Sequence, residues 1–278
     1  MESLSQKNLM KLAKQNEEQG NIGEAIQNLE EALRISNSLD IVLELCRLYR
    51  KNKQEDQAYA LIKAQPDLFS NKQVSEEYFK ILQANNFLIE ALQLENILGE
   101  KIPVKIEPVD VEKQKKIMEL FKSKKQISQF DYEQLLKLDL VNYKNFAQSL
   151  LLDPTQNFAV RLSLCEDLVR LGIKEKIKVW VLGHLEEFIP KNTTLLEKNP
   201  IYQEVISSIG SRYRNNPSQL PVMLGEANLA LGSLYPQISK YITNPDNFAK
   251  DLTSYLEKGN GEGNQELLEK IYANLPNN

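Results

Sequence analysis

The spacing of hydrophobic positions in the first hundred residues is helical. Leu9, Leu12 and Ala13 form one run, and Leu29, with Ala32 and Leu33 after it, belongs to the next. Intervals of three and four residues place apolar side chains on one face of an α-helix. The sequence therefore predicts pairs of amphipathic helices joined by short turns.

These predicted helix pairs repeat at a constant interval. Ala25, Ala58 and Ala91 lie 33 residues apart, and further apolar positions follow each alanine. The turns carry Gly20-Asn21 in the first unit, residues 52–54 in the second and Asn85-Asn86 in the third. Glycine and asparagine tolerate the backbone angles of a helix end. A fixed period of this length predicts stacked helix–turn–helix units, in which the small alanine lets two helices approach closely.

The units resemble the tetratricopeptide repeat. The first is the best match, because residues 20–26 read Gly-Asn-Ile-Gly-Glu-Ala-Ile. It departs from the family pattern at Asn16, where an aromatic is usual, whereas the second unit has Tyr49 there and the third has Glu95 at a usually apolar place. The resemblance covers about residues 5–99. It implies a helical solenoid whose concave groove, lined by the first helix of each pair, binds peptides or partner proteins.

The rest of the chain is predicted to be mainly helical. Residues 101–111 contain two prolines among β-branched residues, which predicts an extended linker between repeats at 1–100 and a helical domain at 112–278. In the first of these helices Ile117, Leu120 and Phe121 form the apolar face, and Asp153-Pro154 starts a strong helix that Gly172 ends. The predicted helices are 112–125, 127–137, 142–151, 154–171, 201–214, 217–234, 245–258 and 265–275.

One segment breaks this helical pattern. Residues 176–182 are rich in β-branched and aromatic residues, Gly183-His184 can turn the chain, and residues 185–189 can return before Pro190. This predicts a β-hairpin near 176–190 that lies on the helices through Trp180 and Phe188. The fold class is thus mainly α: a tetratricopeptide-like solenoid followed by a helical domain with one β-hairpin.

The order of elements is also similar to an uncharacterised group of bacterial proteins that contain tetratricopeptide repeats. The similarity rests on residues 150–154, on Glu166 to Gly172, and on the Asn-Pro-Ile-Tyr segment at 199–202. It implies the same architecture and no particular activity.

Composition and charge favour a protein-binding role over catalysis. With 42% hydrophobic residues, 26% charged residues and a net charge of −4, the chain can bury a core and has no overall attraction to nucleic acid. It has one histidine, His184, and two distant cysteines, Cys46 and Cys165, which we expect to be buried. No nucleophile motif, phosphate loop or usual zinc pattern occurs, so we expect no enzyme and no cofactor. The polar N-terminus and the lack of a long apolar stretch lead us to expect a cytoplasmic protein without a membrane span.

One constellation points to a binding site. Lys14, Arg47 and Lys80 occupy the same first-helix position in the three units, 33 residues apart, and Arg50 lies about one turn beyond Arg47. Cations stacked along the groove could clamp an acidic segment or a carboxylate of a partner. The alternative is a solvated helix face, where long cations are common. The stripe lacks the asparagines of carboxylate-clamp repeats, which argues against that mode of peptide-terminus binding.

Two further alternatives remain open on the sequence alone. The helix pairs could cover one another in a homodimer. A second basic run could contact an acidic partner or nucleic acid, although its aromatic, Phe121, fits the apolar stripe and so is not free to stack on bases. This run consists of Lys113, Lys115, Lys116, Lys122, Lys124 and Lys125.

Overall fold

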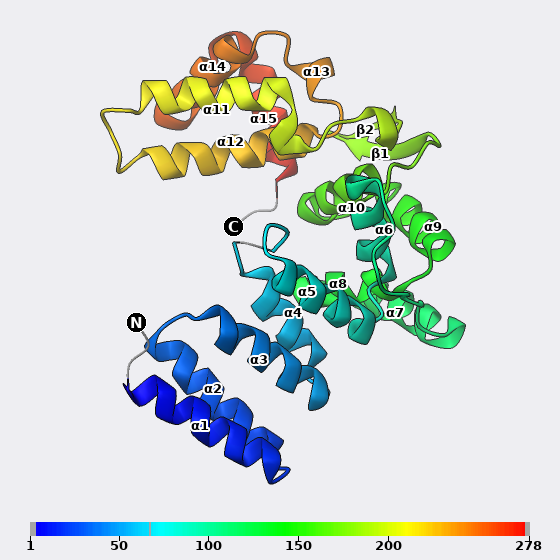
Figure 1. The fold of residues 1–278 in the computed structure, drawn as a ribbon. Helices are drawn as coiled ribbons and strands as arrows, with labels where there is room; N and C mark the ends of the chain where they lie inside the picture. The colour runs from blue at the N-terminus through cyan, green and yellow to red at the C-terminus, as the bar shows by residue number, and fades with distance from the viewer. Residues whose placement is uncertain (1–3, 67, 276–278) are drawn as a thin grey trace. The chain divides into compact units, whose positions relative to one another are not determined.

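The computed structural model describes residues 4–66 and 68–275. Its residues are 69% helical, with a small two-stranded antiparallel sheet, which confirms the predicted fold class. The chain divides into two compact units (Figure 1). The N-terminal unit comprises Met1–Leu120 with Glu133–Leu140, and the C-terminal unit comprises Phe121–Tyr132 with Val141–Asn278.

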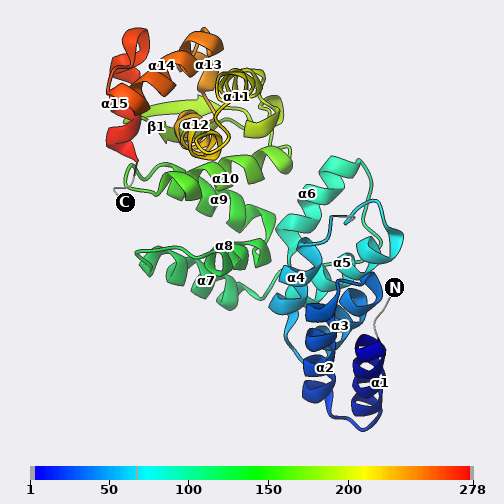
Figure 2. The same ribbon diagram turned by 90° about the vertical axis from the view of Figure 1, so that its left-hand side faces the viewer.

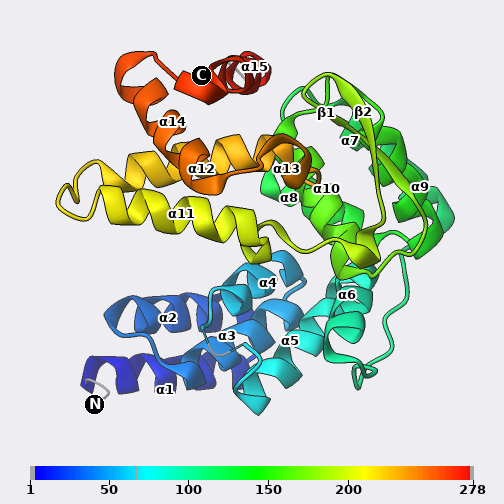
Figure 3. The ribbon, with the colours of Figure 1, turned by 90° about the horizontal axis from the view of Figure 1, so that it is seen from above.

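Helices of the N-terminal unit follow one another as antiparallel neighbours. In Figure 3, α1 and α2 lie side by side, and each successive helix up to α6 contacts the one before it. The α3 helix also contacts α5, so the first helices of the second and third pairs are neighbours. The bounds are α1 Leu4–Glu18, α2 Ile22–Ile35, α3 Leu39–Lys51, α4 Glu55–Lys63, α5 Lys72–Asn85 and α6 Leu88–Leu98.

The three repeating alanines lie inside this stack. Ala25 and Ala58 are fully buried, and Ala91 is 3% exposed. In each pair the alanine N–H donates to the carbonyl oxygen four residues earlier, in the first turn of the second helix, at 3.0–3.2 Å. The three alanines are therefore buried in the first turn of the second helix of each pair, where their predicted role requires a small side chain.

The turn inside each pair has one shared conformation. Gly20, Lys53 and Asn86 all have a positive φ, of 83°, 58° and 59°. In each case the N–H of the next residue donates to the carbonyl five residues back, at 2.8–2.9 Å, which closes the end of the first helix. The predicted turns are confirmed, but in the second unit the left-handed residue is Lys53, not the neighbouring Asn52.

The segment after α6 is irregular, as predicted, yet it is packed against the repeats. Ile102 and Ile106 are buried. Gln83 donates from Nε2 to the Lys105 carbonyl at 2.9 Å, and the side chain of Asn86 donates to the Glu107 carbonyl at 3.1 Å. This segment belongs to the N-terminal compact unit, while the predicted domain division at 100 and 112 stays a prediction.

The next helix, α7 (Val111–Ser123), corrects one predicted face. Phe121 is buried as expected, but Leu120 is 51% exposed. Gln114 is buried instead, where Nε2 donates to the Val109 carbonyl and Oε1 accepts from the Asp139 N–H. Gln114 and Phe121 are two helical turns apart on one line, whereas Leu120 is rotated by about 100° from Phe121.

In the C-terminal unit, α12 packs among several other helices. It contacts α10, α11, α14 and α15, and Figure 2 shows α12 beside α10 and α11. Ala227, Ala230 and Leu231 on α12 are fully buried, as are Leu164 and Leu168 on α10. The remaining bounds are α8 Gln129–Gln134, α9 Leu140–Leu151, α10 Phe158–Arg170, α11 Pro200–Arg212, α12 Leu220–Leu234, α13 Ile238–Tyr241, α14 Pro245–Lys258 and α15 Gln265–Asn274.

The predicted β-hairpin is present, as β1 (Ile177–Val181) and β2 (His184–Phe188). Ile177 pairs with Phe188 and Val181 with His184, so the turn is Leu182-Gly183, one residue earlier than expected. Phe188 is buried, as predicted. Trp180 is only half-buried, since successive residues of a strand face opposite sides, and its indole N–H donates to the Leu152 carbonyl at 2.8 Å.

The helix predicted to start at Asp153-Pro154 begins later, so that prediction was wrong. The Asp153 carboxylate accepts from the backbone N–H and the hydroxyl of Thr155 at 2.9 and 2.7 Å, which makes a turn. The α10 helix starts at Phe158, and the side chain of Asn157 accepts from the Ala159 N–H at 2.8 Å. Aspartate favours a local turn as much as a helix start, and here the turn forms.

The left-handed residue in the second turn yields a stability prediction. We expect Lys53→Gly to raise the free energy of unfolding by about 0.5–1 kcal/mol, because glycine removes the cost of a positive φ. Lys14→Gly, which removes the same side chain from an exposed position within α1, should lower it by about 1 kcal/mol. Urea unfolding followed by circular dichroism measures both. If Lys53→Gly and Lys14→Gly destabilised the protein equally, the left-handed conformation of Lys53 would be wrong.

Candidate functional site

A groove runs between the first helices of the second and third repeats. Its cavity has a volume of about 320 Å³ and is open to solvent. The α3 helix lines it with Asp40, Leu43, Glu44 and Arg47, and α5 lines it with Gln73, Glu76, Glu77 and Lys80.

The two walls of this groove are built from equivalent positions. Every lining residue of α3 has its counterpart on α5 after 33 residues, which is the interval that separates the buried alanines. Since the register of the repeat fixes both faces, the groove is a product of the repeat geometry. The pairs are Asp40 with Gln73, Leu43 with Glu76, Glu44 with Glu77, and Arg47 with Lys80.

The corresponding face of α1 is basic. Subtracting the same interval places Lys7, Met10, Lys11 and Lys14 there. The three lysines are exposed and Met10 is half-buried. Lys14, predicted as a partner-binding residue, makes no ion pair with another described residue.

Arg47 is held by two carboxylates. Its Nη1 donates to Glu17 Oε1 of α1 at 2.8 Å, and its Nε donates to Glu44 Oε2 at 3.0 Å. Lys51 Nζ also lies 2.9 Å from Glu17 Oε1. The hydrogen bonds from Arg47 and then Lys51 lower the pKa of the Glu17 carboxyl to about 2, while the bonds to Glu44 and Glu17 raise the pKa of Arg47.

Arg50 and Lys80 share a second carboxylate. Arg50 donates from Nε to Glu77 Oε1 at 2.8 Å, with Nη2 at 2.7 Å from the same oxygen. Lys80 Nζ is 3.8 Å from Glu77 Oε2. Glu77 is buried, so the Arg50 pair links α3 to α5 within partly desolvated surroundings.

The structure therefore places the four predicted residues on the first-helix face but changes its electrostatic character. Arg47, Arg50 and Lys80 are paired with carboxylates, and the α3–α5 groove has four acidic and two basic lining residues. The face is not a uniform positive stripe. Sequence reasoning missed Glu44 and Glu77, although they recur at the same interval and each precedes its cation by three residues.

The residues considered for catalysis lie apart from this groove. His184 is exposed at the start of β2. Cys46 and Cys165 are fully buried, as predicted, and burial raises the pKa of both thiols, that of Cys46 to about 12. Among the described residues, no cluster of three or more histidine, cysteine, aspartate or glutamate side chains could hold a metal ion. Within the same part of the chain, no helix is long and apolar enough to cross a bilayer.

Comparison with known families agrees with the repeat geometry. The family model described as tetratricopeptide repeat matches residues 17–85, which include α2, α3, α4 and α5. Comparisons with curated proteins and with solved structures gave no match. This segment is thus a tetratricopeptide-repeat segment. Such repeats generally mediate protein–protein interactions and are typically non-catalytic. The match ends before the C-terminal unit, so the likeness to a bacterial group stays a prediction.

The ion pairs of Glu17 make stability depend on pH. A carboxyl whose pKa is lower in the folded protein stabilises the fold above its ordinary pKa, and this contribution disappears as the pH falls towards 2. We expect Glu17→Gln to lower the free energy of unfolding at pH 7 by about 1 kcal/mol, allowing for solvent screening. Urea unfolding should show the difference from the wild type shrinking between pH 4.5 and 2.

The neighbouring Glu18→Gln provides the control. Glu18 is exposed and has no ion pair with a described residue, so its replacement should change the free energy of unfolding by less than about 0.5 kcal/mol. If both variants behaved alike across the pH range, the assigned link between α1 and α3 would be wrong.

Proposed function

We propose that the protein is an interaction scaffold or adaptor that binds a segment of a partner protein in the groove between α3 and α5. The observation that carries this proposal is the lining of the groove by equivalent positions of two consecutive repeats. When consecutive repeats place equivalent residues side by side, each repeat can bind a successive part of an extended segment.

The charges of the groove favour a partner segment with basic side chains. Four carboxylates and two cations leave a net charge of −2 on the lining. Asp40 is exposed, and Glu76 has only a long pair with Lys72, at 3.7 Å. These two carboxylates are therefore the most available to a partner's lysine or arginine, and binding should weaken as salt is added.

An acidic partner segment is the second candidate. The basic face of α1, with Lys7, Lys11 and Lys14, favours it. A carboxylate that reached Arg47 or Arg50 would have to compete with Glu17, Glu44 or Glu77, which already hold them. The predicted partner-binding set of Lys14, Arg47, Arg50 and Lys80 thus stays a proposal in which Lys14 is the most accessible member.

The proposal includes no catalytic step and no cofactor. We also propose a cytoplasmic location. Cys46 and Cys165 are free thiols, which suits a reducing compartment.

A matched pair of charge reversals tests the groove. The partner is first identified by affinity purification with mass spectrometry and then produced as a recombinant protein. The Kd of its complex with the full chain is measured by titration calorimetry. We expect Asp40→Lys with Glu76→Lys to weaken binding at least about tenfold, because attraction becomes repulsion. The control is Glu24→Lys with Glu31→Lys on α2, which changes the net charge by the same amount. Like the groove pair, it replaces one acidic residue in the first turn of a helix and one glutamate in an ion pair. This control should leave Kd unchanged.

The other outcomes separate the alternatives. If Lys11→Glu with Lys14→Glu abolished binding and the groove variant did not, the partner segment would be acidic and would bind on α1 rather than in the groove. Light scattering of the purified chain tests self-association: a dimer that the groove variant dissociates would identify the partner as a second copy. Unchanged affinity in every variant would refute the proposal.

A further inference from the structure

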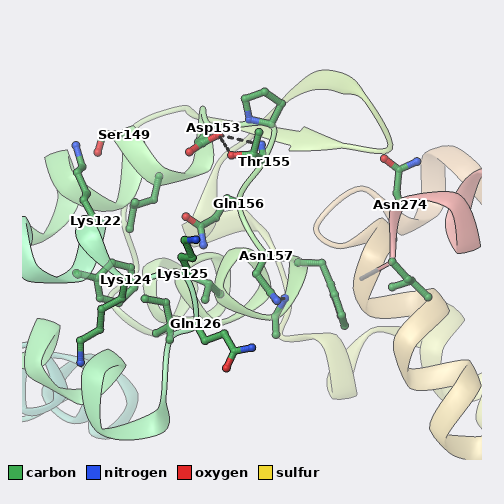
Figure 4. A pocket seen from close by; sticks show the side chains of 18 residues that line it. Lys122, Lys124, Lys125, Gln126, Ser149, Asp153, Thr155, Gln156, Asn157 and Asn274 are labelled. Carbon is green, nitrogen blue, oxygen red and sulfur yellow. Dashed lines mark hydrogen bonds between the residues drawn. The ribbon is translucent and has the colours of Figure 1, made fainter. Parts of the chain in front are cut away.

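The C-terminal unit contains a cavity that the repeat function does not use. It has a volume of about 1040 Å³. Figure 4 shows its walls, which come from the end of α7, the loop after it, the end of α9, residues 153–160 and Asn274 near the C-terminus of α15. Three separate regions of the sequence, at residues 121–127, 149–160 and 274–275, thus meet around one space.

Three lysines line one side of this cavity, and they belong to the second basic run of the sequence. Lys124 forms an ion pair with Asp131. The ammonium of Lys122 lies 5.3 Å from the centre of the Phe146 ring. Lys125 makes no ion pair with another described residue. The lysine ammonium of Lys125 is therefore available to an anion, and the other two add positive charge nearby.

Neutral hydrogen-bonding groups complete the polar lining. Gln126 follows the lysines in sequence, and Gln156 and Asn157 supply two more amides just before the start of α10. The first residues of α10 line the cavity, so the positive end of the helix dipole adds to the field of the lysines. These groups can donate hydrogen bonds to the oxygens of an anion.

Asp153 adds an acidic side chain to the cavity, beside the basic lysines. Hydrogen bonds from the side chain and backbone of Thr155 lower the pKa of its carboxyl, so it stays ionised at neutral pH. A carboxylate repels a phosphate but accepts hydrogen bonds from hydroxyl groups. A ligand that carried an anion at one end and hydroxyls at the other would satisfy both sides.

The basic residues of the cavity suit a phosphate group. All the basic lining residues are lysines, and no arginine is among them. Lysine binds phosphate groups as a point charge, so three lysines around one space supply the positive charge that a phosphate needs.

We propose that this cavity binds a phosphate monoester of a hydroxylated organic molecule, with the phosphate at Lys125 and the hydroxyls at Asp153. Nucleotides and sugar phosphates share this chemistry. The proposal is independent of the partner groove, since every lining residue belongs to the C-terminal unit.

The single tryptophan provides a reporter for the test. Trp180 donates to the carbonyl of Leu152, the residue before Asp153. The full chain is titrated with adenosine 5′-monophosphate, glucose 6-phosphate and inorganic phosphate, and with adenosine and glucose as unphosphorylated controls. Calorimetry gives the Kd and tryptophan fluorescence reports the site. We expect saturable 1:1 binding of at least one monoester, tighter than inorganic phosphate, and none of adenosine or glucose.

Two lysine variants decide whether the cavity is the site. Lys125→Gln should weaken the monoester about tenfold, because a charged contact is lost. Lys116→Gln, at an exposed position of α7 outside the cavity, should leave Kd unchanged. Asp153→Asn should weaken the monoester but not inorganic phosphate. Absence of saturable binding, or equal weakening by Lys116→Gln and Lys125→Gln, would overturn the proposal.

Discussion

The left-handed residue that ends the first helix of each repeat is the constraint on which the N-terminal unit depends. Gly20, Lys53 and Asn86 stop their helices at one fixed point, and a buried alanine follows each of them after five residues. The stop sets where the second helix begins, and the alanine sets how closely it approaches. Because both recur at the same interval, every pair presents its first helix in the same register, and a groove with matching walls follows.

Charged groups then join the first helices of consecutive repeats. Glu17 of α1 holds Arg47 of α3, and Arg50 of α3 holds Glu77 of α5. A third carboxylate, Glu90 of α6, is buried and accepts from the hydroxyls of Tyr59 and Tyr78. Breaking such a partly buried pair leaves an uncompensated charge. The cations that the sequence suggested for partner binding are thus also part of the fold, and the carboxylates beside them determine what the groove can attract.

The sequence predicted the features that repeat at a fixed interval, but not those that depend on contacts between residues far apart in sequence. Ala25, Ala58 and Ala91 revealed the solenoid because a shared period is visible without coordinates. Arg47 was assigned the right face, but its pairing with Glu17 joins residues 30 positions apart on different helices, and no local pattern shows it. The start of α10 was missed because aspartate supports a turn and a helix start equally well. The cavity of the C-terminal unit was missed because its walls come from three regions that are distant in sequence, at residues 121–127, 149–160 and 274–275.

The central claim is that equivalent positions of consecutive repeats form the binding surface. Hydrogen–deuterium exchange of the full chain, alone and with its recombinant partner, tests this claim most directly. Slower exchange should appear in α3 around residues 40–47 and again in α5 around residues 73–80, which are the two walls of the groove. Slower exchange confined to the second helices α2, α4 and α6, or to the C-terminal unit, would contradict it.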